Sequence, residues 1–173
     1  MPKTPLDAIA LLNADHRAVE ELFEKFEKAR GKKADIAKKI CLELTVHTMI
    51  EEEIFYPTCK GVVEEDMLDE AQVEHDGAKM LIAEIVAGSP EDDFFDAKVK
   101  VLSEEIKHHV KEEEQRDGIF AQVKKSDIDL KTLGAKMQAR KDELLADFEE
   151  NRLPLQIVRS LTGAKVEYAR PTV

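Results

Sequence analysis

The chain has 173 residues, of which 43% are hydrophobic and 36% charged, and its formal net charge is −11. This length suits one domain with a substantial core, and the apolar content excludes a fully disordered chain. The acidic balance argues against nucleic acid and anionic membrane surfaces as partners, since both attract a basic face. Two cysteines, Cys41 and Cys59, are too few for a disulfide framework, and we expect both to be ordinary packed residues.

The N-terminal residues lack the apolar core of a signal peptide, and no apolar run in the sequence is long enough to cross a bilayer. We therefore expect a cytoplasmic protein that has neither a membrane nor a nucleic acid as its partner.

Capping residues and helix breakers divide the chain into five expected helices. The first follows a Thr4 cap and ends at Gly31, and the others span about 33–56, 64–87, 90–116 and 127–150. Pro57 is expected to stop the second helix, Ser89-Pro90 to start the fourth, and Ser126 to cap the fifth. Sustained period-two alternation, the signal of strands, is absent from the sequence.

Four long helices with short connections predict an all-α, up-down-up-down four-helix bundle with an additional C-terminal helix and tail. We expect residues 1–150 to form this bundle domain, including the fifth helix near 127–150, and residues 151–173 to form a basic, partly apolar tail. The fifth helix has an apolar face, so the helix and the tail are expected to dock on the bundle or to mediate homo-oligomer contacts.

Four of the five histidines interrupt the apolar stripes of four different helices. They are His16, His47, His75 and His109, and two of these stripes carry a glutamate four residues further on, Glu51 and Glu113. Residues four apart lie on one helix face, and groups near the middle of antiparallel helices meet at one level. Six polar groups without partners in one core are costly, so the joint pattern predicts a buried metal centre.

Each piece of the pattern has a plainer reading when it stands alone. A single histidine on an apolar stripe is usually a satisfied core residue, and a His–Glu pair at i,i+4 is usually solvated. His108 competes with His109, because His108–Glu112 has the same spacing, but its helix face is largely charged. Glu20, four residues after His16, is a lesser candidate ligand.

Four imidazoles and two carboxylates without a thiolate suit iron or manganese, with zinc possible. Helix adjacency assigns His16 and His47 to one ion and His75 and His109 to the other. Glu51 and Glu113 would then bridge the two ions. We expect two iron ions with at least one open coordination position each.

The spaced set resembles the hemerythrin-like HHE cation-binding proteins over roughly residues 4 to 150. The resemblance rests on Asp15-His16, on His47 through Glu52 followed by Ile54-Phe55-Tyr56-Pro57, on Glu74-His75, and on His108-His109 with Glu113-Glu114. It implies a bundle that holds a non-haem di-iron site, with roles in oxygen binding, in sensing of O2, NO or redox state, or in iron handling. Ferritin-like bundles fit less well, because their signature places a glutamate three residues before the histidine.

One departure from the oxygen carriers bears on function. The carriers have a second histidine four residues after the third-helix ligand, where this chain has Lys79, and they use an aspartate at a different spacing in place of Glu113. The resemblance therefore implies a di-iron protein for sensing, storage or stress response, binding a small ligand such as O2, NO or peroxide, rather than an oxygen carrier.

Two other functions remain open on the sequence. The same centre would serve an enzyme acting on peroxide or ferrous iron, with Tyr56 as a proton or electron donor, although we lean against an enzyme. Alternatively, the fifth helix and the tail would make the bundle a partner-binding module.

Overall fold

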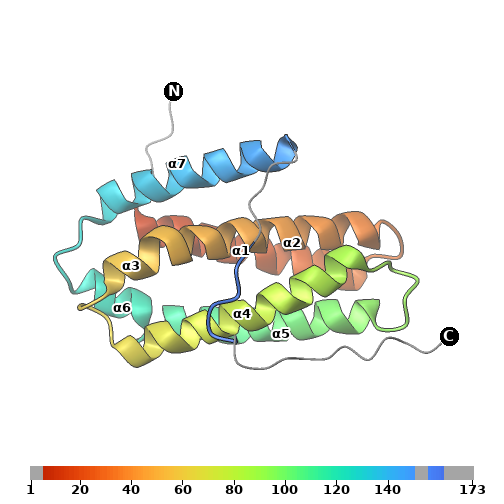
Figure 1. Cartoon of the computed structure of the whole chain (residues 1–173), viewed down its shortest axis with the longest axis horizontal. Coiled ribbons are helices and arrows are strands. Elements are labelled where there is room, and N and C mark those ends of the chain that lie inside the picture. The colour runs from red at the N-terminus through yellow and green to blue at the C-terminus, as the bar shows by residue number, and fades with distance from the viewer. Residues whose placement is uncertain (1–5, 151–155, 162–173) are drawn as a thin grey trace.

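The computed structural model describes residues 6–150 and 156–161 (Figure 1). Within these residues the chain is helical and forms no β-strand, which confirms the predicted all-α fold. The elements are α1 (Ala8–Lys28), α2 (Lys33–Ile50), the π-helix η1 (Glu51–Phe55), α3 (Tyr56–Cys59), α4 (Glu65–Ala87), α5 (Phe95–Glu114), α6 (Ile119–Lys124) and α7 (Leu130–Glu149).

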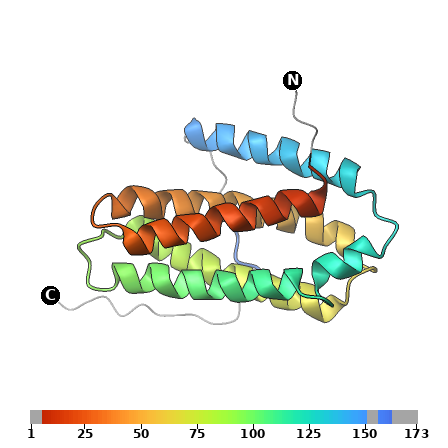
Figure 2. The ribbon, with the colours of Figure 1, turned by 180° about the vertical axis from the view of Figure 1, so that it is seen from behind.

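The four long helices α1, α2, α4 and α5 form a bundle. α1 contacts α2 and α5, and α4 contacts the same two helices from the opposite side. Figures 1 and 2 show that each long helix runs back along the one before it, while α7 lies outside the bundle across α1 and α2. The extra helix thus docks on the bundle, one of the two placements expected for it. Among the described residues no helix is long and apolar enough to cross a membrane.

Several helix starts differ from the sequence predictions. The predicted cap Thr4 lies outside the described residues, and Asp7 caps α1 by accepting a hydrogen bond from the Ala10 amide. α5 begins at Phe95 and not after Pro90, because residues 89–94 form turns. Asp129, and not the predicted Ser126, is the cap of α7, and its side chain accepts hydrogen bonds from the Lys131 and Thr132 amides.

The sequence predicted that Pro57 ends the second helix, but the helical path of α2 continues past this residue. It continues through η1 and α3 to Cys59, and Pro57, which has no amide hydrogen to donate, directly follows the first residue of α3 after the π-helical turn. In the π-helical turn the Tyr56 amide donates to the Glu51 carbonyl, a bond between residues five apart. Insertions of this kind occur frequently at functional sites.

Two apolar clusters fill the bundle, one toward each end. The cluster at the α6 end includes Leu12, Phe55, Phe120 and Met137, so α6 and α7 both contribute to it. The cluster at the other end is built from α1, α2, α4 and α5. Polar side chains contributed by all four bundle helices are also buried, and they form the candidate site.

Candidate metal centre

The six side chains predicted as ligands converge inside the bundle. They are His16 from α1, His47 from α2, Glu51 from η1, His75 from α4, and His109 and Glu113 from α5. Each of them is at most 5% exposed. Their nitrogen and oxygen atoms form two groups close enough to hold an ion, His16–His47–Glu51–Glu113 and Glu51–His75–His109.

The distances within these groups match the pairing expected from helix adjacency. Nε2 of His16 lies 3.2 Å from Nε2 of His47, and Nε2 of His75 lies 3.2 Å from Nε2 of His109. Two neighbouring ligands of one ion lie about 3 Å apart when each metal–nitrogen distance is about 2.1 Å. The spacing therefore suits one ion between each histidine pair.

The two glutamates lie between the histidine pairs. Glu51 Oε2 is 3.2 Å from His47 Nε2 and 3.3 Å from His75 Nε2. Glu113 Oε2 is 3.4 Å from His16 Nε2 and 3.6 Å from His109 Nε2. Each carboxylate thus faces one histidine of each pair and lies between the two pairs.

The other ring nitrogen of every histidine faces a carboxylate from a neighbouring helix. The distances from Nδ1 are 2.7 Å for His16 to Glu114, 3.5 Å for His47 to Asp15, 3.1 Å for His75 to Glu52, and 2.7 Å for His109 to Glu74. Such carboxylates orient metal-binding imidazoles with Nε2 toward the ion and strengthen them as ligands.

These four outer carboxylates form a ring around the bundle. Each one is adjacent in sequence to a candidate ligand of its own helix but supports the histidine of the next helix. A carboxylate of α1 faces the histidine of α2, one of η1 faces that of α4, one of α4 faces that of α5, and one of α5 faces that of α1. No role was predicted for these four acids, although each stands directly beside a predicted ligand in the sequence.

The electrostatics of the metal-free site favour a bound cation. Burial opposes ionisation of Glu51, yet the imidazoles of His47 and His75 hold its pKa well below the usual range. Burial likewise opposes charging of His47, but Glu51 and Asp15 raise its pKa to about 10. For His75, Glu51 and Glu52 outweigh burial and raise the pKa to about 9. The metal-free centre therefore holds protons where a metal ion would otherwise supply positive charge.

Among the six converging side chains, two buried carboxylate oxygens lack the hydrogen-bond partners that such groups normally have. Glu51 Oε1 and Glu113 Oε2 accept no hydrogen bond from the described residues. A buried carboxylate oxygen without a donor is costly unless a cation or water satisfies it. The donor set and these two oxygens therefore fit a metal ion.

Tyr56 is part of the centre, although the predicted ligand set left it out. Its hydroxyl donates to Glu113 Oε1 at 2.9 Å and lies within 3.5 Å of Glu51, His75 and His109. Burial, and then the neighbouring carboxylates, raise the pKa of Tyr56 well above its usual range. In the metal-free protein it is therefore a neutral hydrogen-bond donor.

The structure separates the close alternatives from the six converging residues. The His108 side chain is 62% exposed and pairs with Glu112 and Glu74 at the surface. Glu20 forms an ion pair with Arg17 and stays outside both groups. Lys79 is buried, but its Nζ contacts Glu52 and Asp76 and not the six converging groups.

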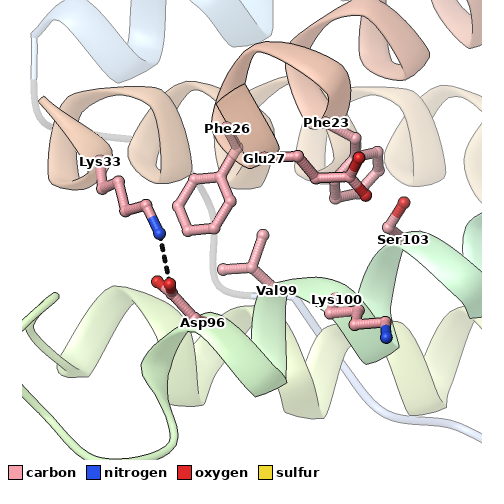
Figure 3. A pocket seen from close by; sticks show the side chains of 8 residues that line it. All are labelled: Phe23, Phe26, Glu27, Lys33, Asp96, Val99, Lys100 and Ser103. Atoms are coloured by element: carbon pink, nitrogen blue, oxygen red, sulfur yellow. Dashed lines mark hydrogen bonds and ion pairs between the residues drawn. The ribbon is translucent and has the colours of Figure 1, made fainter. Parts of the chain in front are cut away.

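A small apolar space adjoins the histidines. Its volume of about 10 Å³ is close to what one water-sized molecule needs. It is lined by the four imidazoles, by the apolar side chains of Val19, Leu44, Ile106 and Val110, and by Asp15 and Thr48. A separate, more open cleft of about 320 Å³ lies between α1 and α5 (Figure 3). The Lys33–Asp96 ion pair lies across this cleft, which contains none of the six residues.

A four-helix bundle with a buried cluster of histidines and carboxylates defines a class of metal-binding proteins. Residues 7–118 match the family described as the Hemerythrin HHE cation binding domain, so the chain belongs to this family. The match ends before α6, which leaves α6, α7 and the tail outside it.

One solved structure has a similar fold, and one further protein is similar in sequence over part of the chain. The crystal structure of a Hemerythrin HHE cation binding domain-containing protein from Mycobacterium kansasii superimposes with a TM-score of 0.69, at 21% identity, over 85% of this chain and 94% of that one. A protein of Nostoc sp. named DNA nickase is 28% identical over 116 residues, which are 66% of this chain and 32% of that protein. The chain therefore spans about a third of this relative's length.

Proposed function

We propose that this protein binds two iron ions at the six converging residues and that the centre takes up a small ligand such as O2, NO or peroxide. The role would be sensing, storage or stress response. The observation that carries this proposal is the arrangement of the four histidines. All four present Nε2 to one buried space and Nδ1 to an outer carboxylate, which is how metal-binding histidines are held.

In this proposal His16 and His47 hold one ion, His75 and His109 hold the other, and Glu51 and Glu113 reach both. Imidazole with carboxylate suits iron better than magnesium or calcium, which prefer oxygen ligands alone. When bound, such a centre supplies open coordination positions and a change of oxidation state. The protein residues exclude water, orient the imidazoles and provide an apolar wall suited to a small uncharged ligand.

The composition of the ligand set also supports a role other than oxygen transport. Lys79 stands where the oxygen carriers have a further histidine, and its amine is engaged with Glu52 and Asp76. The Tyr56 hydroxyl lies beside His75 and His109 instead. The second ion would therefore have fewer imidazole ligands and an oxygen donor close by.

Iron analysis of the full chain purified from iron-supplied cells tests the proposal. We expect about two iron ions per chain and near-ultraviolet absorption bands of an oxygen-bridged, imidazole-bound iron pair. Less than one ion per chain, without those bands, would reject it. Glu51→Ala should lose most of the iron, whereas Glu112→Ala, a glutamate of the exposed His108 cluster, should retain it.

An enzyme acting on peroxide or ferrous iron is the second candidate. The buried Tyr56 hydroxyl favours it, because a proton donor touches Glu113 at the centre. Steady-state peroxide consumption by iron-loaded protein should then fall in Tyr56→Phe. Consumption no faster than that of the Glu51→Ala variant would reject this candidate.

The name of the Nostoc relative does not lead us to propose an action on DNA. That protein matches this chain over 32% of its own length, and the net charge of −11 opposes binding to phosphate backbones.

A further inference from the structure

Each outer carboxylate of the ring is itself paired with a basic side chain. The closest such pairs are Asp15–Lys141, Glu52–Lys79, Glu74–His108 and Glu114–Arg17. Glu52 also has a more distant basic neighbour, Arg159, whose Nε lies 3.8 Å from Glu52 Oε2. The side chains of His108 and Arg17 are 62% and 52% exposed, whereas those of Lys79 and Lys141 are 4% and 14% exposed. Because a charge acts more strongly where water is excluded, Lys79 and Lys141 influence the centre most.

Lys141 comes from α7, which lies beyond the residues that match the family. Its Nζ donates to Asp15 Oδ1, and Asp15 Oδ2 faces His47 Nδ1 at 3.5 Å. Gly134 permits this approach, because a Cβ there would overlap the backbone of residues 6–8 at the start of α1. The position of α7 therefore brings a lysine to the carboxylate behind His47.

Residues 156–161, here called the strap, lie against α4. Asp76 Oδ2 accepts hydrogen bonds from the backbone amides of Arg159, at 2.8 Å, and Ser160, at 2.6 Å. The Ser160 hydroxyl donates to the same oxygen at 2.7 Å. Three donors on one fully buried carboxylate oxygen fix the strap at this position.

The strap also reaches the carboxylate behind His75. Lys79 Nζ donates to the Ile157 carbonyl, to Asp76 Oδ1 and to Glu52 Oε2, each at 2.9 Å. Glu52 Oε1 is in turn 3.1 Å from His75 Nδ1. The strap therefore supplies the third hydrogen-bond acceptor of the buried Lys79 ammonium group, which holds Glu52 in place.

We propose that the C-terminal extension, made of α7 and the strap, regulates the metal centre. It does so by fixing a positive charge behind one histidine of each histidine pair, His47 in the first pair and His75 in the second. The inference rests on the proposed di-iron function. Lys141 and Lys79 are positioning residues, since they act through Asp15 and Glu52 and do not touch the candidate ligands. Tails of different sequence on the same bundle would then give centres of different redox behaviour.

The expected direction follows from charge. A cation held near the centre in low dielectric favours the state with less positive metal charge, which is the reduced state. It also draws electron density from the carboxylate, so the imidazole becomes a weaker donor to oxidised iron. Both effects raise the reduction potential, so loss of the lysine charge should lower it.

The first test compares midpoint potentials of the iron-loaded full chain by spectroelectrochemical titration. Lys141→Met should shift the potential to lower values, and Lys141→Arg should return it toward that of the wild type. Lys136→Met removes an exposed lysine of the same helix and serves as the matched charge control, for which we expect a much smaller shift. Arg17→Met, at the exposed pair, should also have a smaller effect than Lys141→Met.

Equal potentials for Lys141→Met and the wild type, at equal iron content, would overturn the inference for α7. A wild-type chain that binds no iron would instead overturn the proposed function. The two failures are therefore distinguishable.

The second test loosens the strap, including Arg159 beside Glu52, and substitutes neither a lysine nor an outer carboxylate. Ser160→Pro deletes the amide and hydroxyl that bind Asp76, so amide hydrogen exchange at residues 156–161 should become faster. Iron release to a chelator should then accelerate by about tenfold, the lower end of the roughly 10- to 100-fold loss of metal affinity that follows removal of outer partners. Faster exchange of the strap with an unchanged rate of iron release would overturn the inference for the strap.

Discussion

The Tyr56 hydroxyl donates a 2.9 Å hydrogen bond to Glu113 Oε1 across the bundle. Tyr56 follows Glu51 by five residues, and the π-helical turn between them brings both side chains to the same face. In a regular α-helix residues five apart would diverge around the axis. The local backbone irregularity therefore places a second oxygen-bearing side chain of this segment, after Glu51, beside the centre.

Tyr56→Phe should destabilise the metal-free protein by about 1–3 kcal/mol, because it leaves a buried carboxylate oxygen without its donor. The loss should be smaller in the iron-loaded protein, where a cation compensates the carboxylate. Urea unfolding of both forms measures the two free energies. An equal loss in the two forms would contradict the placement of Glu113 as a ligand.

His109 and His108 are neighbours in sequence but should differ in metal binding. His109→Ala removes a buried imidazole of the centre, and we expect the chain to lose at least one of the two proposed ions. His108→Ala is the matched control, since its side chain is 62% exposed, and it should keep the full iron content. Metal analysis of the two variants provides the measurement. Loss of iron in His108→Ala but not in His109→Ala would show that the other face of α5 binds the metal.

The metal-free protein should lose stability as the pH rises. Its folded state raises the pKa of His47 to about 10 and that of His75 to about 9, whereas an unfolded histidine titrates near about 6.5. A raised pKa stabilises the folded state fully below about pH 6.5 and progressively less as the pH rises through about 9 to 10. Urea unfolding between about pH 6 and pH 10 should show this decline.

Iron-loaded protein provides the control for this pH dependence. Its ligand nitrogens hold metal instead of protons, so the decline should be reduced or absent. The same decline in both forms would mean that other groups cause it.

Gly118→Ala should disturb the centre through the backbone. A Cβ at this position would overlap the carbonyls of Glu112 and Glu113, so the end of α5 must shift. We expect a loss of about 1–3 kcal/mol in stability together with weaker iron binding. Gly31→Ala, where a Cβ would meet nothing within 4 Å, is the control and should be neutral or slightly stabilising. Thermal unfolding and iron content of the two variants distinguish these outcomes.

Much of the fold and of the site was predictable because helical period alone determines which residues face the core. The apolar stripes predicted that His16, His47, His75 and His109 meet inside the bundle, and in the structure they do. The charged helix face of His108 predicted its exposure. The all-helical fold with an extra helix, among the described residues, and the family assignment are confirmed, whereas the role of the six residues as ligands stays a prediction.

The remaining features depend on information that a helical period does not contain. A π-helical turn changes the phase by one residue, so Tyr56 could not be placed from i+4 spacing. The turns at 89–94 form because Asp92 accepts from the Ser89 amide, which competes with a helix start at Pro90. The ring of outer carboxylates requires knowing which helices are neighbours, and six-residue α6 was too short to be predicted at all.

α6 nevertheless has a clear role in the structure. Its Phe120 ring stacks on the His16 imidazole, with centroids 5.8 Å apart and planes at 4°. Phe120 also packs against Phe55, so the short helix closes one end of the centre.

Anomalous scattering at the iron edge from crystals of the iron-loaded chain tests the central claim most directly. We predict two peaks inside the bundle, one beside His16 and His47 and the other beside His75 and His109, with Glu51 and Glu113 next to both. A single peak would contradict the dinuclear assignment. Absence of any peak there, or a peak only at the exposed group of Glu74, His108 and Glu112, would contradict the metal centre itself.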